Sequence, residues 1–172
     1  LGYPSWLKYE PTDGSYAANC LWLISRESSD PLSDRRTFVS RLLLDWAIGN
    51  CDNHLKNHSF VWNEDWSHVR LSPLYDVTCT TLYPELSREM DVSLSRSRRI
   101  DDVTVDDVKR LSTAAGIGES IVLGELEKLL AGFQEALEKA EGEIIAEGFP
   151  EASRIAAHVS EEFDDRTRRL GL

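Results

Sequence analysis

The sequence predicts a mainly α-helical fold of the α+β class, a helical bundle with one small β-hairpin in the first half of the chain. Two observations support this prediction. Apolar residues recur every three or four positions in several long segments, above all in the second half. Two short runs rich in aromatic and β-branched residues flank a polar turn, as the strands of a hairpin do. A chain of 172 residues with 41% hydrophobic residues can form one compact core, so we expect a single domain, 1–172.

Helix-start and helix-stop residues accompany the helical periodicity. A short helix is expected over 16–25, and a longer one begins with Ser33 as its N-cap and ends at Gly49. Thr104 and Asp107 have the spacing of a capping box, and Gly116 marks the end of the helix that they begin. Two more helices are expected over 121–145 and 151–169. The spacing predicts that their core-facing residues are Leu126, Leu130, Phe133, Leu137, Ile144, Ile155, Val159 and Phe163.

The hairpin is expected to consist of strands at 59–62 and 67–71, joined by the polar turn 63–65. Trp62 and Trp66 are expected to pack on this hairpin, which lies among the helices. A loop rich in Ser and Thr follows Pro73 and extends to about Arg99.

The charge balance excludes some classes of partner. The chain has 19 Lys and Arg against 30 Asp and Glu, a net charge of −11, which argues against a broad nucleic-acid-binding surface. One basic cluster remains, made of Arg88, Arg96, Arg98 and Arg99. We favour a solvated loop for it over contact with a phosphate, an acidic target or a DNA backbone.

The sequence indicates a cytoplasmic protein with no membrane contact. No apolar run approaches the roughly 20 residues of a membrane-spanning helix, and the first residues lack the pattern of a secretory signal. Cys20, Cys51 and Cys79 are odd in number and widely spaced, so we expect reduced thiols, not disulfides or a zinc site.

The polar segment between the long helix and the hairpin is rich in ionisable residues. Asp52 and Asn57 are five residues apart, as are the catalytic Asp and the metal-binding Asn of a protein-kinase loop. Asp76 follows the hairpin, where a kinase has a second Mg²⁺ ligand. Phosphoryl transfer needs a carboxylate near the attacking hydroxyl, hard oxygen ligands for Mg²⁺ and a cation for the moving phosphoryl group, for which Lys56 is the candidate.

Other interpretations of these residues remain open. Taken alone, Asp52, Asn57 and Asp76 can each be turn residues that bond to their own backbone. His54 and His58 are four apart and suit zinc ligands only if the loop is helical, with no carboxylate between them in the H-E-x-x-H manner. A metal-dependent phosphodiesterase built on Asp52, His54, His58 and Asp76 is a third, less favoured possibility.

Residues 45–57 (DWAIGNCDNHLKN) and 71–76 (LSPLYD) together resemble the HipA family of bacterial Ser/Thr kinases, the toxin halves of toxin–antitoxin pairs. Lys8-Tyr9-Glu10 with Asp13-Gly14 is similar to a loop that precedes the catalytic helix in that family. The resemblance covers nearly the whole chain and implies the C-terminal lobe of a kinase, with the hairpin between its catalytic and metal-binding loops.

The resemblance implies a role for each site residue. Asp52 would be the general base, Asn57 and Asp76 the Mg²⁺ ligands, and His54 and Lys56 would lie along the phosphates of ATP. Like other HipA-like proteins, the chain has His54 where eukaryotic kinases have Lys, and no Phe-Gly follows Asp76. Cys51 occupies a position where the family often has Thr.

The resemblance also implies partners, and the sequence shows what is missing. The expected partners are a helix-turn-helix antitoxin, through which a DNA operator is bound, and a protein substrate in translation. The Gly-rich loop and strand Lys of a kinase N-lobe are absent from the sequence, because Gly116-Ile117-Gly118 fits an interhelical turn. We therefore expect an incomplete active site, or alternatively a non-catalytic module that docks an antitoxin or a separate N-lobe protein.

Overall fold

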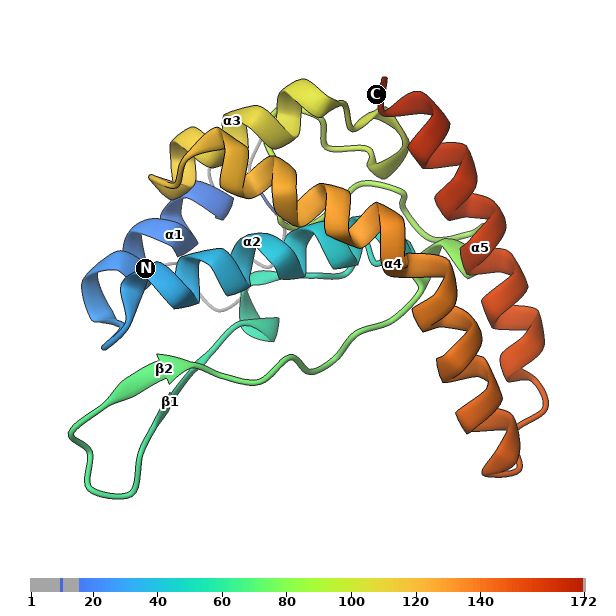
Figure 1. Ribbon diagram of the computed structural model, residues 1–172, viewed down its shortest axis with the longest axis horizontal. Helices are drawn as coiled ribbons and strands as arrows, with labels where there is room; N and C mark the ends of the chain where they lie inside the picture. The colour runs from blue at the N-terminus through green and yellow to red at the C-terminus, as the bar shows by residue number, and fades with distance from the viewer. Residues whose placement is uncertain (1–9, 11–15, 172) are drawn as a thin grey trace.

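The computed structural model describes residue 10 and residues 16–171. Over this part of the chain the fold is mainly helical with one two-stranded antiparallel sheet, as predicted (Figure 1). The elements are α1 (Tyr16–Glu27), α2 (Pro31–Ile48), η1 (Leu55–Asn57), β1 (Phe60–Trp62), β2 (Val69–Leu71), η2 (Thr80–Leu82), η3 (Ile100–Asp102), α3 (Val105–Ala115), α4 (Glu119–Ala146) and α5 (Ala152–Arg169), of which those labelled η are 3₁₀ turns. The loop residues Lys8, Tyr9, Asp13 and Gly14 that contribute to the family resemblance lie outside the described residues.

Helix α2 lies at the centre of the fold and contacts each of the other four α-helices (Figure 1). Phe38, Leu42 and Trp46 follow one another at four-residue spacing, so they share one face of α2, and each is at most 1% exposed. Because α2 is buried on several sides, its C-terminal end is a rigid base for the loop that follows.

The two ends of α2 show one wrong and one confirmed prediction. The helix begins at Pro31, and its N-cap is Asp30, whose side chain accepts a 3.3 Å hydrogen bond from the Ser33 N–H. Ser33 is therefore not the N-cap; a proline fits the first helical position because its missing N–H would have no partner there. Gly49 ends the helix as predicted, with left-handed backbone (φ 80°), and donates its N–H to the Asp45 carbonyl.

Aromatic side chains connect the C-terminal helices to α2. Phe133 of α4 stacks on Phe163 of α5, with ring centroids 4.0 Å apart. Trp46 of α2 meets the same Phe163 ring edge-on at 6.2 Å. Arg166, which is 2% exposed, donates a 2.8 Å hydrogen bond to the Ala47 carbonyl at the end of α2. The position of α5 is thus fixed by packing and by a buried polar contact.

The far ends of α4 and α5 project from the bundle as a helical hairpin (Figure 1). Two predictions fail there, because Ile144 is 44% exposed and Ile155 is 40% exposed. Both segments are helical as predicted, but α2 ends before it reaches this region, so nothing from α2 covers these two side chains (Figure 1). Elsewhere on the two predicted stripes the structure follows the prediction: Leu126, Phe133, Val159 and Phe163 are buried, and Leu130 and Leu137 are partly buried.

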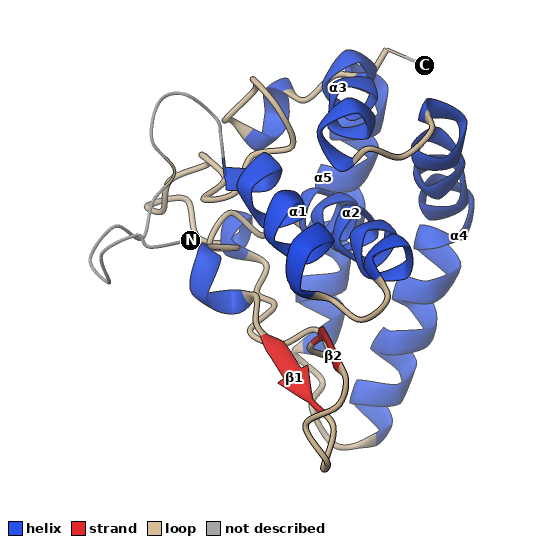
Figure 2. Ribbon diagram, turned by 90° about the vertical axis from the view of Figure 1, so that its left-hand side faces the viewer, coloured by secondary structure: helices blue, strands red, loops and turns tan. Residues whose placement is uncertain are grey.

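Strands β1 and β2 pair with Phe60 opposite Leu71 and Trp62 opposite Val69. Their hairpin projects from one edge of the helices (Figure 2), so the expectation that it lies among them is wrong. The Trp62 and Trp66 rings, which were expected to pack on the hairpin, contact each other with centroids 5.8 Å apart, and both are exposed.

A buried carboxylate joins the base of the hairpin to α2. Asp34, 3% exposed, accepts hydrogen bonds from the Arg70 guanidinium (2.9 Å) and from the Leu71 N–H (2.8 Å). It also accepts one from the Ser28 hydroxyl (2.6 Å). Burial alone would raise the pKa of Asp34, but these hydrogen bonds hold the pKa below its ordinary value.

The basic cluster expected in a solvated loop is largely paired. Arg88 bonds to Asp101 (2.5 Å) and to Glu162 of α5 (2.8 Å), and it joins the 79–102 segment to that helix. Arg98 lies 3.2 Å from Glu89. The prediction that Arg88 lies in a solvated loop is therefore wrong.

Two further expectations concern the thiols and the membrane. Cys20, Cys51 and Cys79 are all free thiols, as expected. Over residues 16–171 the structure contains no helix with both the length and the apolar character needed to cross a membrane.

Candidate active site

The loop that leaves α2 brings Asp52 and Asn57 into direct contact. The side-chain amide of Asn57 donates a 3.0 Å hydrogen bond to the backbone carbonyl of Asp52. This bond closes the loop around η1. The Asp52 side chain is exposed, whereas Asn57 is 6% exposed. The structure thus offers one accessible carboxylate beside one ordered amide.

A buried carboxylate in α2 binds the first residues of this loop. Asp45, in the last turn of α2, accepts hydrogen bonds from the side-chain amides of Asn50 (2.7 Å) and Asn53 (3.4 Å). Burial raises the pKa of Asp45 to about 6, while the two amides and the nearby Arg41 act in the opposite direction. The first residues of the loop are therefore bonded to the helix that precedes them.

Two other segments hold the same loop from either side. The Cys51 N–H donates to the Thr80 hydroxyl (2.8 Å), and the Asp91 N–H donates to the Cys51 carbonyl (2.9 Å). Asn53 exchanges hydrogen bonds with the backbone of Val92, accepting at 3.0 Å and donating at 3.2 Å. Both backbone groups of Cys51 are occupied, so the position of Asp52 is fixed by its neighbours.

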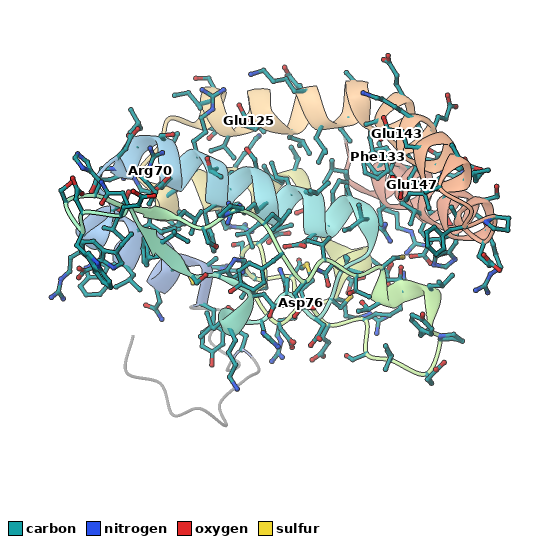
Figure 3. The ribbon with its side chains drawn as sticks, turned by 90° about the horizontal axis from the view of Figure 1, so that it is seen from below. Arg70, Asp76, Glu125, Phe133, Glu143 and Glu147 are labelled. Carbon is teal, nitrogen blue, oxygen red and sulfur yellow. The ribbon has the colours of Figure 1, made fainter. Side chains whose placement is uncertain are left out.

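A tyrosine joins the loop of Asp76 to the loop of Asn57. The Tyr75 hydroxyl lies 2.8 Å from the Lys56 carbonyl, to which it donates, and 3.2 Å from the Ser59 hydroxyl. Tyr75 precedes Asp76, and Lys56 precedes Asn57. Asp76 is exposed and has left-handed backbone (φ 56°), a conformation that Asp tolerates better than most residues and that is frequent at functional sites (Figure 3).

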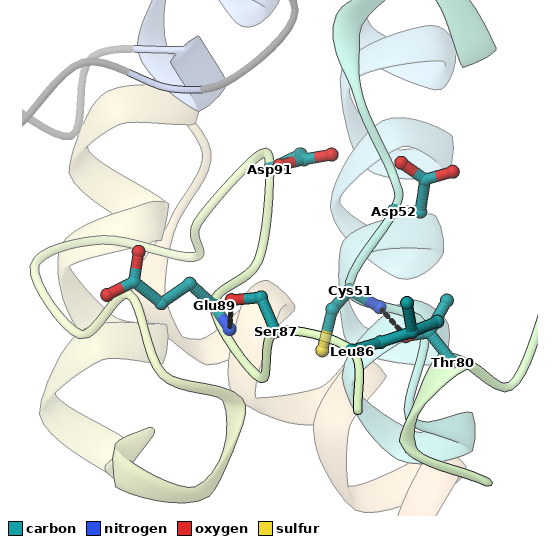
Figure 4. A pocket seen from close by; sticks show the side chains of 7 residues that line it. All are labelled: Cys51, Asp52, Thr80, Leu86, Ser87, Glu89 and Asp91. Carbon is teal, nitrogen blue, oxygen red and sulfur yellow. Dashed lines mark hydrogen bonds between the residues drawn. The ribbon is translucent and has the colours of Figure 1, made fainter. Parts of the chain in front are cut away.

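A pocket of about 300 Å³ lies beside Asp52 (Figure 4). Its lining residues are Cys51, Asp52, Thr80, Leu86, Ser87, Glu89 and Asp91. The carboxylates of Asp52 and Asp91 lie at the same end of it. Three of the seven described lining side chains are carboxylates and none is basic, although one of the three, Glu89, is paired with Arg98.

The remaining predicted site residues differ in accessibility. Lys56 is exposed, whereas His54 is 9% exposed and its Nδ1 is buried without a partner among the described residues. The His58 ring packs edge-on against Phe38, with centroids 5.0 Å apart. Burial, with Arg41 nearby, lowers the pKa of His58 to about 4. His58 is therefore a packing residue, which gives no support to the zinc or phosphodiesterase readings.

The chemistry of Asn57 and Asp76 suits Mg²⁺. Because Asn57 uses its Nδ2 to bond Asp52, its Oδ1 is left as an acceptor, and no described residue donates to it. Among residue 10 and residues 16–171, no group of three or more His, Cys, Asp or Glu is arranged to hold a metal. A pair of oxygen ligands from the protein suits Mg²⁺, which keeps several waters and binds phosphate oxygens as well.

Several residues of the site were missed by the sequence analysis. The burial of Asp45 could have been predicted, because this carboxylate precedes Trp46 and lies near the apolar face of a helix that forms the core. Thr80, Asp91 and Val92 had none, because they lie in a segment without periodicity, and their role comes from contacts distant in sequence.

The comparisons with known proteins agree with the resemblance. The model of the family described as "HipA-like C-terminal domain" matches residues 1–141. A protein of Sinorhizobium fredii named "Putative kinase Y4mE" is 27% identical over 137 residues, which is 80% of this chain and 32% of the relative. A second protein of that organism, "Putative kinase Y4dM", is 28% identical over 124 residues, 72% of this chain and 29% of the relative.

A solved structure matches at the level of the fold. It is the HipA of Shewanella oneidensis, determined in a complex with HipB and operator DNA, with a TM-score of 0.75 and 18% identity over 90% of this chain. The match covers 36% of that protein, so the chain spans about a third of the length of the proteins it resembles. The family model covers most of the chain. The chain therefore belongs to the HipA-like C-terminal domain family.

Proposed function

We propose that the chain forms the C-terminal lobe of a Ser/Thr-protein kinase, which transfers the γ-phosphoryl group of ATP to a protein hydroxyl. The observation that carries the proposal is the pair of contacts that joins the two loops in which the three candidate residues lie. Asn57 bonds to the Asp52 carbonyl, and Tyr75 joins the loop of Asp76 to the residue before Asn57. The names of the relatives support the kinase class.

In this proposal each side chain has a defined task. Asp52, exposed beside a pocket, accepts the proton of the attacking hydroxyl. Asn57 and Asp76 hold Mg²⁺ through oxygen atoms, and the exposed Lys56 offsets negative charge on the phosphates. Bound Mg²⁺ would supply charge neutralisation at the phosphate oxygens. His54 would lie along the phosphates of ATP, although in this structure the side chain is 9% exposed.

We further propose that this kinase is the toxin of a toxin–antitoxin pair. Support comes from the solved relative, whose structure is that of a HipA with HipB and operator DNA. The proposed partners are a helix-turn-helix antitoxin, DNA bound only through that antitoxin, and a protein substrate in translation.

A second candidate function is a binding module without chemistry of its own. This sequence contains no Gly-rich loop and no strand Lys, the groups that hold nucleotide in a kinase N-lobe. Such a module would dock an antitoxin or a separate N-lobe protein and would need no ordered metal site.

Paramagnetic Mn²⁺, which can replace Mg²⁺, distinguishes the two candidates on this chain. With ATP present, Mn²⁺ should broaden the amide NMR signals of 52–57 and 75–77 selectively. Asp76→Asn should abolish this effect, and Glu64→Gln, in the exposed hairpin turn, should preserve it. Broadening that is centred elsewhere, that persists in Asp76→Asn, or that is absent altogether would contradict the assigned metal site.

A further inference from the structure

An apolar groove lies between α2 and α4, on residues with no part in the proposed phosphoryl transfer. Its volume is about 430 Å³. Two of the lining residues, Leu44 and Ile48, come from the C-terminal half of α2, and the others from α4: Lys128, Leu129, Gly132, Phe133, Ala136, Leu137 and Ala140. Small residues on α4 create the hollow, and only one lining residue is charged. An apolar, concave surface of this kind suits an apolar ridge from a partner.

The same face of α4 continues past the groove onto the projecting helical hairpin. Ile144 follows Ala140 by four residues, so the two share a face, and Ile144 is 44% exposed. Phe149, just beyond α4, is 59% exposed. The apolar face of α4 therefore continues past the groove at least as far as Ile144.

Carboxylates border this end of the surface. Glu143 lies seven residues after Ala136 and Glu147 seven after Ala140, so both fall on the groove side of the helix (Figure 3). The only described ion pair of these two is a 3.9 Å contact of Glu143 with Lys139, which is exposed and contributes little. At the opposite end Lys128 is already paired with Glu125 at 3.4 Å. The charge on the border is thus negative.

The shape and the charge together select the occupant. A second copy of this chain presents the same hollow and a net charge of −11, so two grooves would neither fill nor attract each other. An amphipathic helix places a continuous apolar ridge in a groove, and basic residues beside that ridge would meet Glu143 and Glu147. Both carboxylates lie beyond residues 1–141 that the family model matches, so the shared features of the family do not account for them.

We propose that the groove between α2 and α4 docks an amphipathic helix of a partner protein, with Lys or Arg beside its apolar ridge. This surface is separate from Asp52 and the metal ligands, and the inference does not depend on the proposed kinase activity. The partner would bind in either case.

Two glycines of α4 supply a matched pair of variants. Gly132 lines the groove, and a Cβ atom added there meets nothing within 4 Å, so the position has room for a side chain and Gly132→Leu should occupy the hollow. Gly142 also has nothing within 4 Å but lies on the opposite face from the groove. Gly142→Leu is therefore the control, and thermal unfolding of both variants verifies that α4 is intact.

The probes are two synthetic helical peptides of about 18 residues, with Leu at i, i+3, i+4 and i+7, that differ only in carrying Lys or Glu beside the ridge. By fluorescence anisotropy, the Lys peptide should bind the wild-type chain at least about tenfold more tightly than the Glu peptide. Gly132→Leu should weaken binding of the Lys peptide by at least about tenfold. Gly142→Leu should leave it within about twofold, and Glu143→Lys with Glu147→Lys should reverse the preference for charge.

Equal binding of the two peptides, no binding of the Lys peptide, or binding that Gly132→Leu leaves unchanged would overturn the proposal. Sedimentation analysis excludes the competing occupant. If the wild-type chain forms dimers that Gly132→Leu dissociates, the groove is an interface between copies and the proposal is wrong.

Discussion

The Tyr75 hydroxyl donates a 2.8 Å hydrogen bond to the backbone carbonyl of Lys56 and so joins two loops that are separated by the β-hairpin. On one side of this bond the next residue is Asp76, and on the other it is Asn57. The two proposed metal ligands come from different segments of the chain. This hydrogen bond joins the residues directly before them. The hairpin between them acts as a spacer that returns the chain to the same place.

We predict that Tyr75→Phe weakens binding of Mg²⁺ or Mn²⁺ in the presence of ATP. The substitution removes one hydrogen bond that contributes about 0.5–1.5 kcal/mol, which corresponds to an affinity loss of up to about tenfold. Titration calorimetry measures the affinity, and Tyr83→Phe, at a tyrosine that is 47% exposed, is the control. An unchanged affinity in Tyr75→Phe would mean that the bond does not position Asp76.

Gly49→Ala should destabilise the protein more than Gly116→Ala. Both glycines have positive φ, which costs any other residue about 1 kcal/mol. A methyl group on Gly49 would also collide with the Thr81 side chain, whereas on Gly116 it would meet only the flexible end of Arg35 at 3.0 Å. We expect losses of about 3 and about 1 kcal/mol in urea unfolding. Equal losses would show that Thr81 moves aside freely.

The stability contribution of Asp45 should decrease as the pH rises. Its pKa is about 6 in the folded protein against 3.8 ordinarily, so the folded state binds the proton more tightly. The contribution is complete below pH 3.8 and is lost as the pH rises through 6, a change of about 3 kcal/mol. Urea unfolding of wild type and Asp45→Asn between pH 4 and pH 7 measures it. A difference between the two proteins that does not vary with pH would contradict the burial argument.

His58 should show the opposite pH dependence. Burial lowers its pKa to about 4 from 6.5, so its contribution is present above pH 6.5 and is lost as the pH falls toward 4. Compared with His58→Gln, the wild-type protein should become more stable as the pH rises. Compared with Asp45→Asn, it should become less stable as the pH rises. The same slope in both comparisons would refute one of the two assignments.

Asp34→Ala should loosen the hairpin. It leaves the Arg70 guanidinium and the Leu71 N–H without their acceptor, and we expect a loss of about 3 kcal/mol. Asp30→Ala removes a helix cap and an exposed 3.7 Å ion pair with Arg70, but leaves the Leu71 N–H bonded to Asp34, and it should cost about 1 kcal/mol. Hydrogen exchange should accelerate at β1 and β2 in Asp34→Ala and not in Asp30→Ala. Unchanged exchange would mean that the hairpin is held by other contacts.

The elements that the sequence predicts well are those with local causes. The capping box of Thr104 and Asp107 forms as the spacing predicts, and Gly49 ends α2 in left-handed backbone. The positions of Asp52, Asn57 and Asp76 relative to the helix and the hairpin also follow from local spacing, because a hairpin necessarily brings its two ends together.

The failures have a different origin, in contacts between distant segments. Ile144 lies at the helical spacing expected of a core residue, but it is exposed. Its burial would require α2 to extend further, and the sequence of α4 alone does not show where α2 ends. Arg88 lies in a loop of the sequence, and its ion pair with Glu162 of α5 depends on a contact between segments far apart in the chain. The bonds of Thr80 and Asp91 to Cys51 join positions about thirty and forty residues apart in a segment without periodicity.

The most direct test of the central claim is phosphoryl transfer. The chain should be joined to the part of a full-length relative that it does not span, and transfer of label from γ-³²P-ATP to protein should be measured with Mg²⁺. We predict that Asp52→Asn and Asp76→Asn each lower the rate by at least about a hundredfold, and that Asp65→Asn in the exposed hairpin turn does not. Undiminished labelling in Asp52→Asn would contradict the assignment of the base, and with it the account of this site.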